Sequence, residues 1–149
     1  MMKILLVEDF EEKAHNIMSF LKEEFPCYEI IRCSSYNSAQ EMIFDHSEDF
    51  QLILLDMSMS TYDLIVDASG GLPEPSAGEY ILEGMFLRDI DTPVIVITMY
   101  NVFGRKELSD FNTELKAKYP QNYKSYVFYS SQKTDWKKEL KQQINNIGL

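Results

Sequence analysis

The chain has 149 residues, of which 45% are hydrophobic and 13% aromatic, and its formal net charge at pH 7 is −10. This length and apolar content suffice for one buried core, so a single domain is expected over residues 1–149. The acidic balance argues against direct nucleic-acid binding, because phosphate recognition requires a surplus of lysine and arginine. No apolar run approaches the 18 residues of a membrane span, and no signal peptide is recognisable. The sequence therefore predicts a soluble, cytoplasmic protein with no membrane partner.

Five short apolar runs are typical of β-strands. They are four to six residues long and rich in Ile, Val, Leu and Tyr. Their near-continuous apolar character is expected of strands that are covered on both faces of a parallel sheet. The runs are Ile4–Val7, Tyr28–Cys33, Leu52–Leu55, Val94–Thr98 and Tyr126–Tyr129.

Segments with the three-and-four spacing of amphipathic helices separate these runs. Pro26 and Pro120 follow two of the segments and are expected to end their helices. Alternating strands and helices with right-handed crossovers predict an α/β fold, in which helices cover both faces of a five-stranded parallel sheet. The helical segments are residues 14–25, 38–44, 79–87, 108–119 and 136–147.

Two further features lie outside this alternation. Residues 58–78 read SMSTYDLIVDASGGLPEPSAG, which is long for a strand-to-helix loop in a compact domain, and we interpret the stretch as a loop insertion. Cys27 and Cys33 match neither a zinc spacing nor a disulfide framework, so both are expected to be buried thiols.

Polar side chains follow three of the predicted strands at their carboxyl ends. Glu8 and Asp9 follow the first run, Asp56 follows the third, and Thr98 ends the fourth. Each alone could be an ordinary turn or strand-end residue. Together they should meet at one edge of the sheet, where sites lie in folds of this kind. Three carboxylates repel one another and are suited to a hard divalent cation, above all Mg²⁺.

This joint pattern resembles the receiver domain of two-component response regulators, the CheY-like superfamily. The resemblance covers most of the chain and is most specific at residues 3–10, 52–56 and 92–98. It implies a flavodoxin-like sheet with strand order 2-1-3-4-5. It also implies a phosphoprotein that takes part in phosphorelay signal transduction.

The resemblance further implies a role for each polar residue. Asp56 would be the phosphoacceptor, and Thr98 would be the switch hydroxyl that bonds the phosphoryl group. Glu8, Asp9, Asp56 and the backbone carbonyl of Ser58 would hold Mg²⁺, directly or through water. A carboxylate nucleophile beside a metal that neutralises phosphoryl charge is what phosphoryl transfer to a side chain requires.

Two departures from the receiver pattern stand out. Receivers usually end the fifth strand with Lys-Pro, and the lysine pairs with the phosphoryl group. An ungapped match starting from Tyr126 puts Tyr129 at that position, whereas counting back from Leu140 puts Lys133 there. It is equally open that Lys133 is simply a solvated residue near the start of a helix. Receivers also place a glycine soon after the phosphoacceptor, whereas Gly78 lies 22 positions after Asp56.

The leading interpretation is a stand-alone receiver that takes a phosphoryl group from a histidine kinase, or from a small donor such as acetyl phosphate, and signals through an unidentified partner protein. The alternative is a pseudo-receiver, a protein-interaction module that works without phosphorylation. The missing Lys-Pro and the long insertion favour the alternative, and the intact acids and Thr98 oppose it. No enzymatic activity is expected beyond phosphorylation and dephosphorylation at Asp56. A phosphatase of the haloacid dehalogenase type would need an Asp where Ser58 stands, and homodimerisation is left open.

Overall fold

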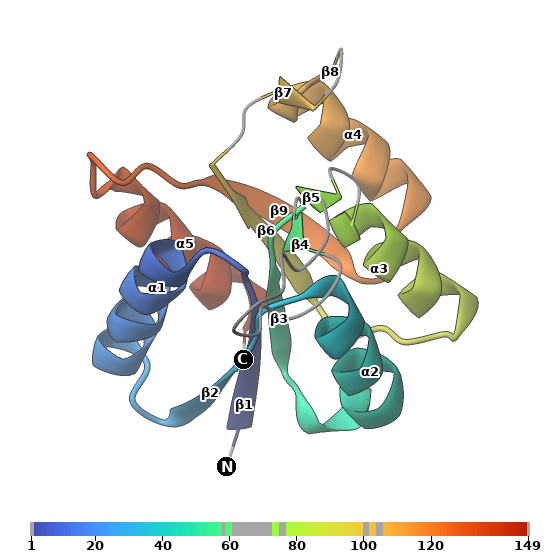
Figure 1. Cartoon of the computed structure of the whole chain (residues 1–149), viewed down its shortest axis with the longest axis horizontal. Coiled ribbons are helices and arrows are strands. Elements are labelled where there is room, and N and C mark those ends of the chain that lie inside the picture. Colours follow the sequence, from blue (N-terminus) through green and yellow to red (C-terminus); the bar gives the residue numbers. More distant parts are fainter. Residues whose placement is uncertain are drawn as a thin grey trace, which may run out of the picture.

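The computed structural model describes residues 2–57, 59–60, 73–74, 77–99, 102–103 and 106–148. Five parallel strands form its central sheet in the order β2-β1-β3-β6-β9 (Figure 1). Numbered among themselves along the chain, these strands have the predicted order 2-1-3-4-5, so the predicted α/β fold is confirmed. The strands are β1 Met2–Val7, β2 Tyr28–Cys33, β3 Leu52–Leu55, β6 Val94–Thr98 and β9 Tyr123–Phe128.

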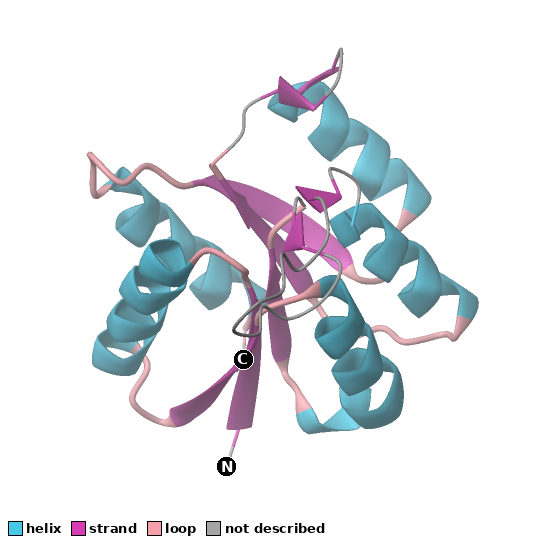
Figure 2. Ribbon diagram, viewed as in Figure 1, coloured by secondary structure: helices cyan, strands magenta, loops and turns pink. Residues whose placement is uncertain are grey.

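Helices cover both faces of the sheet. Figure 2 shows α1 and α5 on one side of the strands and α2, α3 and α4 on the other. A short 3₁₀ helix, Ser47–Asp49, precedes β3. The helices are α1 Glu11–Glu24, α2 Tyr36–His46, α3 Ala77–Leu87, α4 Leu108–Lys118 and α5 Asp135–Ile147.

The alternation of side chains along each strand divides the core into two layers. Leu5 and Leu55 face the cluster built with α2, α3 and α4, whereas Leu6 and Leu54 face the cluster built with α1 and α5. All four residues of β3 are fully buried, as expected for a central strand with helices on both sides. The strands that end at this edge are therefore packed between two layers of helices.

The last strand and one cysteine differ from the predictions. β9 begins at Tyr123, three positions before the expected start, because it is an edge strand in which polar positions such as Lys124 alternate with buried ones. A purely apolar run therefore covers only part of it. Cys27 is exposed in the turn before β2, so the prediction that it is buried was wrong, whereas Cys33 is buried as expected.

The predicted loop insertion at 58–78 lies largely outside the described residues. Its described parts are the two-residue strands β4, Met59–Ser60, and β5, Pro73–Glu74, which pair in an antiparallel manner, and Ala77–Gly78, which already belong to α3. A second antiparallel pair, β7 Val102–Phe103 and β8 Lys106–Glu107, precedes α4. Within the described ranges, none of the helices has the length and apolar character needed to cross a membrane.

Candidate functional site

The pairing of the neighbouring strands β1, β3 and β6 places one residue from the end of each strand side by side. Val7 pairs with Leu55, and Leu55 pairs with Val96. The next positions along these strands are Glu8, Asp56 and Ile97, which are therefore at one level of the sheet. The backbone N–H of Asp56 donates to the Val7 carbonyl at 3.1 Å, which fixes the start of the loop after β3.

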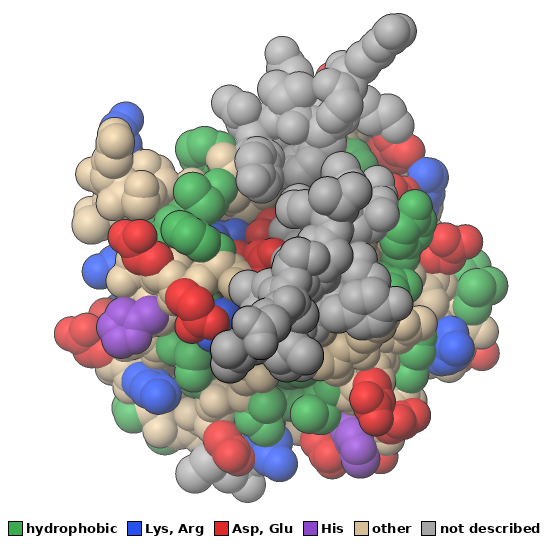
Figure 3. Space-filling model, viewed as in Figure 1, with side chains coloured by type: hydrophobic (Ala, Val, Ile, Leu, Met, Phe, Trp, Pro, Cys, Tyr) green, Lys and Arg blue, Asp and Glu red, His purple; other side chains and the backbone are tan. Residues whose placement is uncertain are grey.

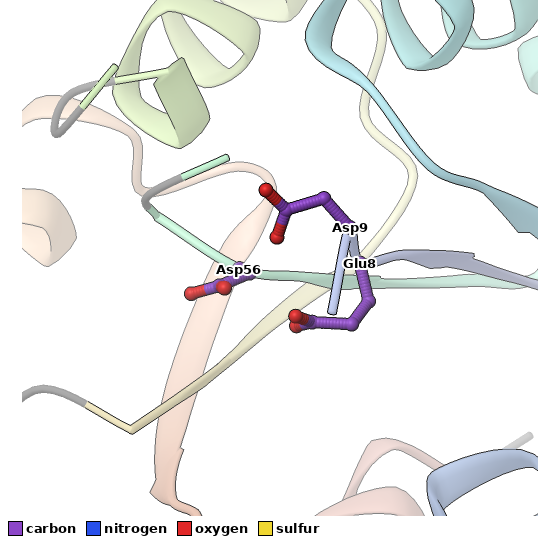
Figure 4. Close-up of side chains that lie close together, drawn as sticks. All are labelled: Glu8, Asp9 and Asp56. Atoms are coloured by element: carbon purple, nitrogen blue, oxygen red, sulfur yellow. The ribbon is translucent and has the colours of Figure 1, made fainter. Parts of the chain in front are cut away.

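Three carboxylates meet at this edge. One oxygen from each of Glu8, Asp9 and Asp56 lies within 4.8 Å of the others (Figure 4). Glu8 and Asp56 are buried, whereas Asp9 is partly exposed. Acidic side chains are scattered over the face seen in Figure 3 and also gather near its centre, where β1 and β3 end. The structure thus brings together the three acids that the sequence analysis singled out.

The same edge holds a buried lysine that the sequence analysis missed. Lys13 lies in the first turn of α1 and is fully buried. Its Nζ atom lies 2.7 Å from Glu8 Oε2 and 3.4 Å from Asp56 Oδ2, and it donates a hydrogen bond of 2.8 Å to the Ile97 carbonyl. A signal for it existed, because Lys13 shares the helical spacing of Ile17 and so occupies the apolar face of α1.

The electrostatics of the site favour an additional cation. The pKa of Glu8 is raised to about 8: burial is the largest cause, the charge of Asp56 adds to it, and Lys13 opposes both effects. One ammonium cannot neutralise three carboxylates. The donor set consists of carboxylate oxygens, which suits Mg²⁺ because this ion prefers oxygen ligands and binds through one or two carboxylates together with water.

The other predicted site residues are placed as follows. Thr98 is fully buried at the end of β6, one residue beyond Ile97. Ser58 lies outside the described residues. Lys133 is exposed and lines a pocket between α1 and α5 together with Asn16 and Trp136.

Tyr129 fills the position directly after β9. It is 2% exposed, and its backbone N–H donates to the Thr98 carbonyl at 2.8 Å. Its hydroxyl accepts a hydrogen bond of 3.0 Å from Asn16 Nδ2, and its ring lies 5.0 Å from the ring of Trp136, measured between centroids. The place where the receiver resemblance expects a lysine is therefore occupied by an aromatic side chain packed between α1 and α5.

Gly78 holds α3 against the segment that carries Asp56. Its N–H donates to the Met57 carbonyl at 3.0 Å. A Cβ atom at this position would lie 2.8 Å from the Asp56 carbonyl oxygen and 2.9 Å from Met57 Cα, which real Cβ atoms essentially never show. The close approach of the two backbones explains why a glycine stands here.

Comparison with known proteins identifies relatives along the whole chain. No family model matches it. The Detocs response regulatory protein DtcB of Enterobacter cloacae (strain JD6301) is 32% identical over 151 residues, which cover 98% of this chain and 100% of the relative. The uncharacterized protein y4jR of Sinorhizobium fredii (strain NBRC 101917 / NGR234) is 28% identical over 145 residues, 94% of this chain and 95% of the relative.

Solved structures share the fold. CheY in the CheX–CheY–BeF3–Mg²⁺ complex of Borrelia burgdorferi matches with a TM-score of 0.69 at 14% identity, covering 99% of this chain and 90% of that one. TrrA of Thermotoga maritima in complex with Mg²⁺ and BeF matches with a TM-score of 0.61 at 21% identity, covering 96% and 99%. The match to DtcB covers nearly all of this chain and all of the relative, and the chain therefore belongs to the response regulator family of receiver-domain proteins.

Proposed function

We propose that this protein is a receiver that accepts a phosphoryl group on Asp56 in a Mg²⁺-dependent reaction and signals through a partner protein. The observation that carries the proposal is the meeting of Glu8, Asp9 and Asp56 within 4.8 Å at the carboxyl edge of the sheet. We take the Asp56 carboxylate as the acceptor because it follows the central strand β3 and, at 4% exposed, is largely shielded from water.

The transfer requires little covalent chemistry from the protein. An oxygen of the Asp56 carboxylate attacks the donor phosphorus, the new O–P bond forms an acyl phosphate, and the bond from phosphorus to the donor group breaks. Bound Mg²⁺ would supply charge neutralisation on the phosphoryl oxygens. Glu8, Asp9, Asp56 and the Ser58 carbonyl are the groups proposed to hold the ion, and the Thr98 hydroxyl is proposed to donate to the transferred group.

The donor and the recipient of the signal follow from the same chemistry. A phosphohistidine of a histidine kinase, or a small donor such as acetyl phosphate, supplies a phosphoryl group on a good leaving group. The structures of CheY with CheX, BeF3 and Mg²⁺ and of TrrA with Mg²⁺ and BeF support the proposal of a divalent ion and a phosphoryl group at this site, because beryllofluoride mimics a phosphoryl group. We propose that a separate protein binds the phosphorylated form of this chain, as CheX and CheY form a complex in Borrelia burgdorferi.

Intact-mass spectrometry tests the proposal. The protein is incubated with acetyl phosphate, with Mg²⁺ in one sample and a chelator in the other. The mass of one phosphoryl group should appear only with Mg²⁺ and should be absent in Asp56→Asn. The control variant is Asp49→Asn, which changes an exposed acid before the start of β3, at the end of the strand opposite to the site. This variant should behave as wild type. No mass gain with acetyl phosphate or with a phosphorylated histidine kinase would reject the proposal in favour of the pseudo-receiver.

A further inference from the structure

Lys13 has an unusual environment for a lysine. The first turn of a helix disfavours a cation because the backbone N–H groups give that end a partial positive charge. Burial disfavours it further, because a charge removed from water must be compensated by partners. Lys13 is nevertheless fully buried in the first turn of α1. The groups around its ammonium must therefore hold it there.

The three groups that this ammonium contacts lie at the carboxyl ends of three adjacent strands. Glu8, Asp56 and Ile97 are the residues at one level beyond the paired residues of β1, β3 and β6. Lys13 Nζ contacts all three, at 2.7, 3.4 and 2.8 Å respectively. The contact with the Ile97 carbonyl is a hydrogen bond, and the other two contacts are ion pairs with the carboxylates. Lys13 thus links the proposed acceptor directly to the backbone of β6, one residue before Thr98.

Tyr129 and Asn16 help to hold the Lys13 side chain in this position. The Lys13 ammonium lies 5.7 Å from the centroid of the Tyr129 ring, within the range of a cation–π contact. Asn16, which follows Lys13 by three positions on α1, donates to the Tyr129 hydroxyl. The side chain after β9 therefore packs against the helix that carries the lysine and lies beside its ammonium.

We propose that Lys13 is the residue that contacts the phosphoryl group on Asp56, and that Tyr129 positions it. This inference rests on the proposed function and deepens it. On transfer, Asp56 loses its carboxylate charge and gains a phosphoryl group of about −2 charge. The Lys13 ammonium then exchanges its ion pair with Asp56 Oδ2 for a contact with a phosphoryl oxygen, while the hydrogen bond to the Ile97 carbonyl keeps it attached to β6.

The test compares Lys13→Met with Lys22→Met, the same change at an exposed position of the same helix. Two quantities are measured for each variant: the affinity for Mg²⁺, and the concentration of beryllofluoride, a phosphoryl mimic, that produces half of the amide NMR shifts in β6 and β9 at saturating Mg²⁺. Loss of Lys13 should tighten Mg²⁺ binding, because a like charge leaves the site. It should raise the beryllofluoride requirement by roughly tenfold or more, the usual strength of a charge-assisted hydrogen bond.

These opposite changes separate a phosphoryl contact from a purely structural role, which would weaken both ligands together. Lys22→Met should match wild type in both measurements. Tyr129→Leu, which removes the ring, should raise the beryllofluoride requirement less than Lys13→Met does. Because Lys13→Met removes the partner of two buried acids, a measurement on the wild type keeps the test independent of its folding. The side-chain ammonium ¹⁵N signal of Lys13 should shift on adding beryllofluoride.

Three outcomes would overturn the inference. An unshifted Lys13 ammonium signal in a wild type that responds to beryllofluoride would exclude the contact. A normal response in Lys13→Met with a lost response in Lys133→Met would assign the contact to Lys133. A wild type that neither responds to beryllofluoride nor gains a phosphoryl group would overturn the proposed function and this inference together, whereas the first two outcomes leave the proposed function standing.

Discussion

Replacing Gly78 by alanine perturbs the site through the backbone and changes no functional group. The new Cβ would lie 2.7 Å from Met57 Sδ, 2.8 Å from the Asp56 carbonyl oxygen and 2.9 Å from Met57 Cα. Ordinary contacts of this kind are about 3.5–4.0 Å, so something must move by roughly 0.5–1 Å. The methionine side chain can turn away, but the other two atoms belong to the backbone that carries the proposed acceptor. Either α3 or the Asp56–Met57 segment must therefore shift.

The size of the effect follows from two opposing contributions. Overpacking a well-filled site costs about 1–3 kcal/mol. Alanine favours the helix over glycine by at most about 1 kcal/mol, and by less in the first turn. We expect Gly78→Ala to lower the free energy of unfolding by about 1–2 kcal/mol. We also expect weaker Mg²⁺ binding, because Asp56 moves relative to Glu8 and Asp9.

Urea unfolding measures the first quantity and Mg²⁺ titration measures the second. Gly84→Ala is the matched control, because it is the same change in the same helix. Its Cβ would meet the ring of Phe44, a side chain that can turn, and no atom of the acid site. Gly84→Ala should therefore leave Mg²⁺ affinity unchanged whatever it does to stability. Wild-type stability and Mg²⁺ affinity in Gly78→Ala would refute the reasoning.

Three further predictions concern other groups. Asp9→Asn should raise the melting temperature in metal-free buffer by removing one like charge, and should abolish the rise caused by Mg²⁺; a lower metal-free melting temperature would mean that Asp9 is structural. In a thiol-labelling assay, the folded protein should react quickly at Cys27 and at Cys33 only on unfolding; equal rates would contradict the burial of Cys33. In metal-free buffer, stability should fall as pH rises from 4.5 to about 8, because the folded state binds the Glu8 proton more tightly than the unfolded state. Glu8→Gln should flatten that pH dependence, and an unchanged slope would show that another group causes it.

The sequence alone determined the sheet and the meeting of the acids. Short apolar runs alternating with amphipathic segments are compatible with few folds other than a parallel sheet covered by helices on both sides. In such a sheet, residues that directly follow neighbouring strands must lie at the same edge. Glu8, Asp9 and Asp56 could therefore be grouped without coordinates, because their positions relative to the strands depend only on the local chain.

The tertiary structure alone decided which cation meets those acids. The helical spacing assigns Lys13 to the apolar face of α1, but the partners of that face depend on how the helix docks on the sheet. Its ammonium reaches the carbonyl of Ile97, 84 positions away along the chain, and lies over the ring of Tyr129. The sequence pattern after the last strand points only to Lys133 or Tyr129, because it contains no information on which helix docks a lysine against the acids. A buried charge is held by contacts among several distant segments, and those contacts exist only once the helices have packed against the strands.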